Sequence, residues 1–369
     1  MSLWLDGEIS PHYPPLDGDA TADVAVVGAG IAGIATAYLL ASTGANVIVL
    51  EARGVAEAAS GRNAGFLLAG VAENFVAASR RYGEASALRI WRFTKRTQAL
   101  VRSLVAEHAI DCALRWNGSD QIAGDGDEWL EIRESAERLV SEGVAVSIDS
   151  RGRSATYADD GEVHPVRWVR GLAAAAIKKG ARIYESTRVD AVEAGGVRTR
   201  AGVVRARATV LCTNAYTAHL ASSRVRPVRG QMLATAAAAP IFARPAYAHR
   251  GYRYWRQTSD GRVLVGGWRD TAVGEEVGEE ERTTEAIQKQ LEAFLREHGI
   301  TATVTHRWAG TMGFSHDALP YIGRISPGVF VCGGFSGHGM AFGPAAAELV
   351  AALVQGEAHP DADLFDPLR

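Results

Sequence analysis

The sequence predicts an α/β fold, and three stretches of its 369 residues carry that prediction. Near the N-terminus, a glycine-rich turn lies between two short apolar runs, 24–27 and 47–50, and a helical pattern starts at Ile31. Between 228 and 313, apolar and polar residues alternate with the period of β-strands. A strand-like run at 329–332 is again followed by glycines and an apolar helical stretch. Strand, glycine turn and helix therefore occur near both ends of the chain, around a strand-rich middle.

The first glycine-rich turn reads Gly28-x-Gly30-x-x-Gly33 and has the strand and helix context of a dinucleotide-binding site. Gly28 permits a tight turn, Gly30 lets the backbone approach a pyrophosphate, and Gly33 lets helix and strand pack closely. The pyrophosphate is expected on free N–H groups at the helix start. Glu51 ends the second strand, where its carboxylate can accept a hydrogen bond from an adenosine ribose. The motif predicts a dinucleotide fold but does not distinguish NAD from FAD.

Composition and charge describe an ordinary globular protein, long enough for two domains. Lys plus Arg number 39 and Asp plus Glu number 42, a balance that gives no reason to expect nucleic acid or an anionic membrane as partner. Cys112, Cys212 and Cys332 lie far apart, and no Cys/His cluster suggests a metal. The N-terminus lacks the pattern of a signal peptide, and no apolar run reaches membrane-spanning length. We therefore expect a soluble, cytoplasmic protein.

The elements between these motifs follow from periodicity and from helix start and stop signals. Residues 1–20 are rich in Pro and Gly and are predicted to be extended loop. Helices are predicted at 84–108, 127–142, 165–179 and 280–298, and strands at 144–148, 182–193, 196–200 and 203–206. The small, polar segment 60–65 is either a surface turn or a second patch of cofactor contact. A further strand from 208 ends in small polar residues that can start a turn against a ligand.

Several separated segments resemble the D-amino-acid-oxidase-type flavoenzyme superfamily. They are the first strand–helix–strand unit, SGRNAGF, CTNAYT, RWAGTMGFSHDALPYIG and the terminal GGFSGHGMAFGP, in the family's order. Within this superfamily the chain most resembles the γ-glutamylputrescine oxidase group, beside glycine oxidase and sarcosine oxidase. The resemblance implies the glutathione-reductase-2-type flavoenzyme fold. Its discontinuous Rossmann-like FAD-binding domain would comprise 1–85, 150–222 and 315–369, and a substrate domain with a mixed or antiparallel sheet would comprise 86–149 and 223–314.

The resemblance also implies which residues hold FAD. They are Gly28, Ala29, Gly30, Ile31, Ala32, Gly33, Glu51, Ala52, Arg53, Ser60, Gly61, Arg62, Asn63, Ala64, Gly65, Val189, Thr213, Asn214, Gly337, His338, Gly339 and Met340. Arg53 and the backbone of Val189 are expected near the adenine, and 60–65 along the pyrophosphate and flavin. The N–H groups of 337–340 are expected at the flavin N1/O2 edge, where they would stabilise the negative charge that builds on reduction. Gly310 stands where a relative has a flavin-linked cysteine, so we expect non-covalent FAD.

The reaction implied by the resemblance is oxidation of a C–N bond in an amine or amino acid. A neutral amine gives hydride to flavin N5, the imine is hydrolysed, and O2 or an electron carrier takes the electrons. Two alternatives stay open: an amino-acid dehydrogenase that passes electrons to a carrier, and a non-catalytic flavin-binding accessory protein. A nicotinamide dehydrogenase is disfavoured because the chain has only one GxGxxG. The sequence does not indicate an oligomeric state.

Five residues are predicted at the catalytic, substrate-facing side of the flavin: Tyr254, Trp255, Trp268, Met312 and His338. Tyr252 is expected with them. Aromatic side chains can enclose an amine and exclude water. Alternating aromatics on a strand are also typical of a hydrophobic core, which is the competing interpretation.

The residues that grip a substrate carboxylate in relatives are replaced here by Met312 and Ala341. Extended or secondary amines are therefore expected over small α-amino acids, unless Arg253, Arg256 or Arg269 compensates. No lysine falls within 250–270, where a relative has its O2-activating lysine, so the sequence does not separate oxidase from dehydrogenase. His316 and Asp317 are expected to have structural roles.

Overall fold

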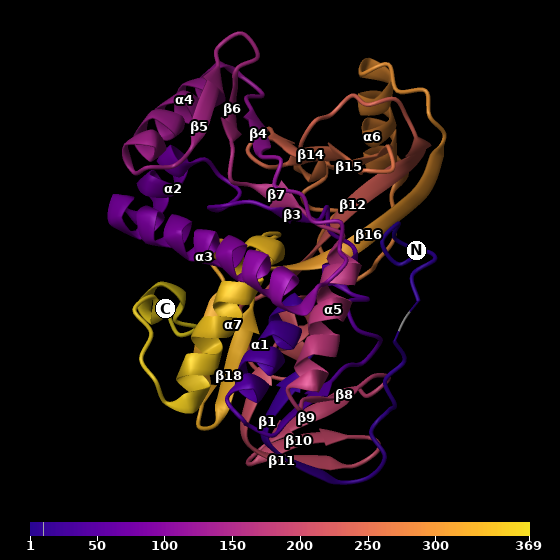
Figure 1. Cartoon of the computed structure of the whole chain (residues 1–369), viewed down its shortest axis with the longest axis vertical. Helices are drawn as coiled ribbons and strands as arrows, with labels where there is room; N and C mark the ends of the chain where they lie inside the picture. Colours follow the sequence, from indigo (N-terminus) through magenta and orange to yellow (C-terminus); the bar gives the residue numbers. More distant parts are fainter. Residues whose placement is uncertain (10) are drawn as a thin grey trace.

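The computed structural model describes residues 1–9 and 11–369, and it contains two large sheets with helices packed around them (Figure 1). In Figure 1 the first sheet lies at the bottom and the second at the top. The first sheet contains parallel strand pairs and packs against helices. The second sheet is mixed, and most of its strand pairs are antiparallel. This arrangement confirms the predicted α/β fold class.

The first sheet has the strand order β17-β18-β11-β1-β2-β8, with β10 and β9 joined to β11. Its strands are β1 (Ala20–Val27), β2 (Val47–Leu50), β8 (Arg182–Tyr184), β9 (Val189–Glu193), β10 (Gly196–Thr199), β11 (Val203–Leu211), β17 (Tyr321–Ser326) and β18 (Val329–Gly333). The central strand β1 pairs in parallel with β2 and with β11. The last four residues of β1, 24–27, are buried, as expected for a strand covered on both faces.

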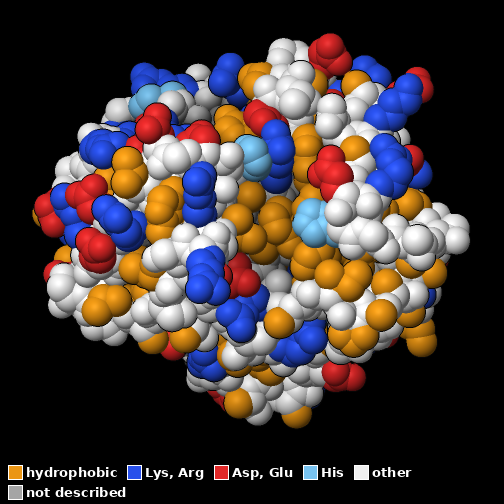
Figure 2. Space-filling model, turned by 90° about the horizontal axis from the view of Figure 1, so that it is seen from above, with side chains coloured by type: hydrophobic (Ala, Val, Ile, Leu, Met, Phe, Trp, Pro, Cys, Tyr) orange, Lys and Arg blue, Asp and Glu red, His pale blue; other side chains and the backbone are white. Residues whose placement is uncertain are grey.

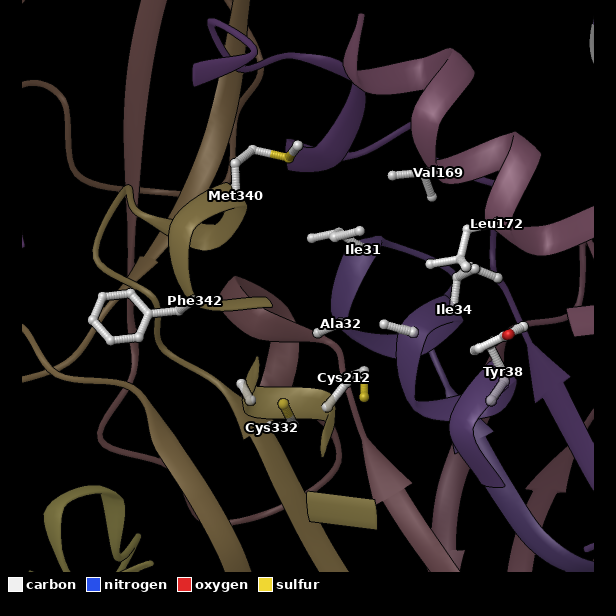
Figure 3. Packing of buried hydrophobic residues seen from close by; sticks show 14 of the residues in the cluster. Ile31, Ala32, Ile34, Tyr38, Val169, Leu172, Cys212, Cys332, Met340 and Phe342 are labelled. Carbon is white, nitrogen blue, oxygen red and sulfur yellow. The ribbon is translucent and has the colours of Figure 1, made fainter. Parts of the chain in front are cut away.

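Helices α1 (Ile31–Ser42), α5 (Pro165–Lys178) and α7 (Gly339–Gln355) pack together against the first sheet, and α3 (Glu84–His108) contacts α5 and α7 (Figure 1). Because α1 touches helices on both sides, it is apolar almost all round. Figure 3 shows Ile34 of α1 close to Leu172 of α5. Cys212 and Cys332 lie together at the ends of β11 and β18 in the same view. This packing holds the start of α1 at the carboxyl end of β1.

The second sheet has the order β16-β12-β15-β14-β13-β4-β6-β5. Its strands are β4 (Ser119–Ile122), β5 (Val146–Asp149), β6 (Ser154–Tyr157), β12 (Arg226–Ala237), β13 (Ala246–Ala248), β14 (Arg253–Gln257), β15 (Arg262–Gly267) and β16 (Val304–Phe314). Helix α6 (Glu285–Glu297) packs its buried residues against β12 and β15. Helices α2 (Phe75–Tyr82) and α4 (Gly126–Ser141) pack together near β5 and β6. Strands β3 (Phe66–Leu67) and β7 (Gly161–Glu162) form a separate two-stranded sheet.

Most predicted elements lie within a few residues of the observed ones, because hydrophobic period and helix caps are local signals. Helix α3 has the predicted bounds, and α6 is five residues shorter at its start. One domain boundary needs correction. Strand β6 pairs with β4 and β5, so residues 154–157 belong to the second sheet although 150–222 was assigned to the first domain. The other domain boundaries stay predictions.

Candidate active site

A cavity of about 770 Å³ lies between the two sheets. Its walls include the carboxyl ends of β1, β2 and β11, the starts of α1 and α7, and parts of β12, β14 and β16. The strand order reverses at β1, and ligands of open α/β sheets bind in the crevice outside such a point. Figure 2 shows a face that is hollowed near its middle, with hydrophobic side chains inside the hollow and Lys, Arg and His side chains around it.

Most residues predicted to hold a dinucleotide line this cavity. The lining includes Gly28, Gly30, Ile31, Ala32, Glu51, Ala52, Arg53, Ser60, Arg62, Asn63, Ala64, Val189, Thr213, Asn214, Gly337, His338, Gly339 and Met340. Four predicted contacts do not line it: Ala29, Gly33, Gly61 and Gly65. These four act through packing or through backbone hydrogen bonds.

The turn between β1 and α1 and the first turn of α1 each contain one position that has room only for glycine. Gly28 has a φ of +104°, and a Cβ there would lie 2.8 Å from the carbonyl oxygen of Cys212. A Cβ at Gly33 would lie 1.9 Å from the carbonyl oxygen of Gly28. Neither neighbour is a flexible side chain, so a larger residue would displace backbone. This turn therefore brings the start of α1 directly beneath the cavity.

The start of α1 is an uncapped, positively polarised helix end. No side chain caps the helix at Gly30, and its first turn contains no acidic residue. The Ile31 N–H donates to the Ser60 hydroxyl, 2.9 Å away, and the N–H groups next to it have no partner within the helix. Such an end favours an anion, because the aligned peptide dipoles place partial positive charge there. Its position in the cavity wall fits the phosphates of a dinucleotide.

Glu51 joins the two turns that border the nucleotide end of the cavity. One carboxylate oxygen accepts the Ala29 N–H at 2.7 Å, and the other accepts the Arg53 N–H at 2.8 Å. Burial raises the pKa of Glu51 above its usual value. An ionised carboxylate can accept about four hydrogen bonds, so two sites remain for hydroxyl donors. Although Ala29 does not line the cavity, its N–H thus fixes a carboxylate that does.

The segment 59–65 is held in place by hydrogen bonds from several directions. The Ser2 hydroxyl donates to the Gly61 carbonyl at 2.6 Å, and the Trp4 indole N–H donates to the Asn63 carbonyl at 2.6 Å. The Gly65 N–H donates to the Asn63 side chain at 2.7 Å. From the second sheet, Arg256 donates to the Ala64, Gly65 and Val163 carbonyls. The segment was interpreted either as a surface turn or as a second patch of cofactor contact. Its position in the cavity wall agrees with the second interpretation.

The other end of the cavity is formed at the start of α7. The helix has no side-chain cap and no acidic residue in its first turn, so the N–H groups of Gly339 and Met340 face no partner within the helix. Gly337 has a φ of +89° in the turn that precedes it. The Asn214 amide oxygen accepts the Gly334 N–H at 2.9 Å and thereby holds this turn against the end of β11.

Uncharged aromatic residues face the α7 end of the cavity. The His338 and Tyr247 rings are stacked at 6.0 Å, and Tyr247 lies 5.7 Å from Tyr254. Burial lowers the pKa of His338 to about 4 and raises the pKa of Tyr254 to about 12. Met312 and Tyr252 also line this part of the cavity. Near neutral pH the wall therefore carries neither an imidazolium nor a phenolate.

Two predicted substrate residues, Trp255 and Trp268, do not reach the cavity. Both lie in the core beneath α6, with ring centroids 4.7 Å and 5.6 Å from that of Phe294. Consecutive strand residues point to opposite faces, so Tyr254 and Trp255 cannot both face the ligand. For the two tryptophans the competing core interpretation was correct. For Tyr254, Met312 and His338 the position agrees with the predicted role.

Tyr247 is the main cavity residue that the sequence prediction missed. Its ring lies beside Tyr254 because the two residues are partners in the β13–β14 ladder. Only the register of that ladder reveals the pair, although the alternation in 246–248 was a weak signal. Asp317 accepts from Arg369 at 2.8 Å, which agrees with its predicted structural role. His316 lies 2.7 Å from the Tyr321 hydroxyl but also lines the cavity, so its predicted structural role stays a prediction.

Within residues 1–9 and 11–369, no group of three or more His, Cys, Asp or Glu side chains is arranged to hold a metal ion. In that same part of the chain, no helix has the length and apolarity needed to cross a membrane.

Comparison with known proteins shows which family the chain matches. The model of the family described as FAD dependent oxidoreductase matches residues 23–353. The chain is 27% identical to the probable oxidoreductase OrdL of Haemophilus influenzae over 94% of this chain and 86% of that protein. It is 27% identical to the gamma-glutamylputrescine oxidoreductase of Escherichia coli over 96% of this chain and 87% of that protein. The fold resembles that of glycine oxidase from Geobacillus kaustophilus, with a TM-score of 0.81, 24% identity, and coverage of 95% of this chain and 99% of that one.

Proposed function

The chain belongs to the FAD-dependent oxidoreductase family, and we propose that it oxidises a C–N bond in an amine or amino acid. The partner molecules proposed are that substrate and an electron acceptor, either O2 or an electron carrier. FAD, when bound, supplies the two-electron acceptor for the oxidation. The remaining task of the protein is to bind the cofactor, orient the amine and keep it unprotonated.

The residues of the cavity fit FAD. The uncapped start of α1 suits the pyrophosphate, and the Glu51 carboxylate has acceptor sites left for ribose hydroxyls. The start of α7 offers a second set of N–H donors. Gly310 has no side chain to form a covalent link, and we propose that FAD is held non-covalently.

The observation that carries the proposed reaction is the uncharged aromatic wall near the start of α7. Tyr254 and His338 are both neutral there because burial disfavours their charged forms. Each carboxylate that lines the cavity, Glu51, Glu73 and Glu279, already has a partner within the chain. An ammonium ion without a carboxylate partner is costly to bury. The site therefore selects the neutral amine, which has the lone pair needed to expel a hydride, and no general base is required.

The proposal for the electron acceptor rests on a separate property of the site. All four lysines of the chain, Lys95, Lys178, Lys179 and Lys289, lie outside the described cavity lining. No ammonium group is therefore available there to promote reaction with O2. We propose that transfer to a carrier competes with transfer to O2, and the rates of reoxidation by O2 and by a soluble quinone measure the balance.

The test is an anaerobic absorption spectrum of the purified protein before and after addition of polyamines, N-methyl amino acids and D-amino acids. We expect a flavin spectrum that at least one of these amines bleaches. The bleaching rate should rise with pH through the pKa of the substrate amine, with no second transition from Tyr254 or His338 between about pH 6 and pH 10. A protein that binds FAD but is reduced by no amine or amino acid would contradict the proposed reaction.

A further inference from the structure

Two buried tryptophans donate hydrogen bonds to neighbouring carbonyl groups of the segment 59–65. The Trp4 indole N–H donates to the Asn63 carbonyl oxygen at 2.6 Å, and the Trp308 indole N–H donates to the Arg62 carbonyl oxygen at 2.9 Å. Trp4 precedes the first strand of the chain, and Trp308 belongs to β16 of the second sheet. Each tryptophan is 3% exposed, and neither lines the cavity. Two segments that are far apart in the sequence therefore hold adjacent peptide groups of the cavity wall.

The N–H groups of the same two peptides point the opposite way. A trans peptide places its N–H on the side opposite to its carbonyl. The Asn63 N–H therefore points away from Trp308, and the Ala64 N–H points away from Trp4. Both Asn63 and Ala64 line the cavity. Among residues 1–9 and 11–369, no group accepts a hydrogen bond from either N–H. Because a buried N–H without an acceptor is costly, these two donors are arranged for a ligand.

The neighbouring N–H groups of this segment have acceptors within it. The Arg62 N–H donates to the Ala59 carbonyl at 3.2 Å, and the Gly65 N–H donates to the Asn63 side chain at 2.7 Å. Within 62–65, the two N–H groups without an acceptor are thus those of the peptides whose carbonyls the tryptophans hold.

These two donors lie at the end of the cavity where α7 starts. Asn63 and Ala64 surround a small cavity of about 30 Å³ together with Gly337, His338 and Met340, and all five residues also line the main cavity. The uncapped start of α7 offers its own N–H donors at this end. The pyrophosphate is expected elsewhere, at the start of α1. The Asn63 and Ala64 N–H groups therefore face the part of the cavity that is expected to hold the flavin.

We propose that Trp4 and Trp308 are positioning residues, which fix two peptide groups so that the Asn63 and Ala64 N–H groups donate to acceptor atoms of the flavin. This inference rests on the FAD binding of the proposed function and not on the amine oxidation. Without an indole donor, a buried carbonyl loses its partner and can regain one only if the peptide rotates. Rotation would turn the carbonyl toward the acceptor atoms of the ligand and remove the N–H that binds them.

Replacing tryptophan by phenylalanine removes the donor and keeps an aromatic ring. At position 4, a phenyl ring can retain the contacts of the indole with the Arg256 guanidinium, at 5.3 Å, and with the His164 ring, at 4.9 Å. Trp168→Phe is the matched control. Trp168 is fully buried and does not line the cavity, and its indole nitrogen has no hydrogen-bond partner in the described part of the chain. The control therefore loses a similar ring volume without the loss of a hydrogen bond.

The test compares FAD with ADP, which carries the adenosine and the diphosphate but no flavin. Calorimetric titration of the apoprotein gives the dissociation constant of each ligand for the unmodified protein, Trp4→Phe, Trp308→Phe and Trp168→Phe. The absorption spectrum of bound FAD reports the surroundings of the flavin, and thermal unfolding of each apoprotein reports its stability.

We expect Trp4→Phe and Trp308→Phe each to weaken FAD binding roughly 3- to 10-fold, as for the loss of one hydrogen bond, and to shift the absorption bands of bound FAD. Binding of ADP should change less than about twofold, because the nucleotide end does not depend on these peptides. Trp168→Phe should lower the unfolding temperature and leave both dissociation constants and the spectrum unchanged.

Equal weakening of FAD and ADP would mean that the tryptophans only support the fold of the segment, and it would overturn the inference. Unchanged FAD binding and an unchanged spectrum in Trp4→Phe would overturn it as well, even if Trp308→Phe does not fold. If the unmodified protein binds FAD but no amine reduces it, the proposed oxidation fails while this inference stands. If the unmodified protein does not bind FAD, both fail.

Discussion

Replacing Glu51 by Gln should separate the cofactor-binding role of this carboxylate from its structural role. In the folded chain the two oxygens accept the Ala29 N–H at 2.7 Å and the Arg53 N–H at 2.8 Å. Glutamine has nearly the same shape, but one of its two terminal groups is an NH2 donor. One of the two backbone N–H groups would then face another donor. The same change removes the negative charge that can accept from a ribose hydroxyl.

The magnitude follows from the bonds that are lost. A hydrogen bond to a charged group contributes about 1.5–3 kcal/mol, which corresponds to a roughly 10- to 150-fold rise in the Kd for FAD. The unpaired N–H adds a stability cost of about 1–3 kcal/mol to the folded chain itself. Titrating the apoprotein with FAD and following the quenching of flavin fluorescence gives the Kd. Thermal unfolding of the apoprotein gives the structural part separately.

Glu57→Gln is the matched control. Glu57 is an acid of the same loop region that accepts the Gly54 N–H at 3.2 Å and does not line the cavity. The Glu57→Gln substitution should leave the Kd for FAD within about twofold of the value for the unmodified protein. Because burial raises the pKa of Glu51, FAD binding to the unmodified protein should also weaken as the pH falls through that pKa. If Glu51→Gln binds FAD as tightly as the unmodified chain, the Glu51 carboxylate does not bind the ribose of FAD.

Two further predictions concern the core. Trp255→Leu should lower the free energy of unfolding by about 2–4 kcal/mol, since the ring packs on Phe294. The Kd for FAD and the rate of flavin reduction should not change; a selective loss of reduction rate would mean that Trp255 contributes to the active site. Burial raises the pKa of Asp160 to about 6, above its unfolded value, so its contribution to stability is complete below about pH 4 and is lost as the pH rises through 6. Denaturant unfolding should show a loss of roughly 3 kcal/mol over that interval, absent in Asp160→Asn.

The nucleotide end of the cavity was predictable because its signals are local. The spacing of Gly28, Gly30 and Gly33, followed by Glu51 at a strand end, places phosphate and ribose ligands within one strand–helix–strand unit. Helix α3 was predictable for the same reason: its apolar period repeats along 25 consecutive residues. Such patterns need no knowledge of which distant segments pair.

The domain boundary and the aromatic wall depend on pairing between distant strands. Strand β6 joins the second sheet through ladders with β4 and β5. The sequence of its four residues does not predict these partners. Tyr247 lies beside Tyr254 because of the register of the β13–β14 ladder. Tyr254 lines the cavity, whereas Trp255, the next residue of β14, does not. A shift of register by one residue would have exchanged the two faces.

By itself the sequence determined that this chain builds a dinucleotide fold, because glycines, strand ends and helix starts act over a few residues. The tertiary structure alone decided which aromatic residues face the cavity and which of these arginines lacks a carboxylate partner among residues 1–9 and 11–369. The sequence does not distinguish Arg253, Arg256 and Arg269. In the folded chain Arg253 and Arg256 have carboxylate partners. The Arg269 guanidinium instead lies over the rings of Tyr252 and Phe314. The physical reason is that the charge available to a ligand depends on contacts between residues far apart in the chain.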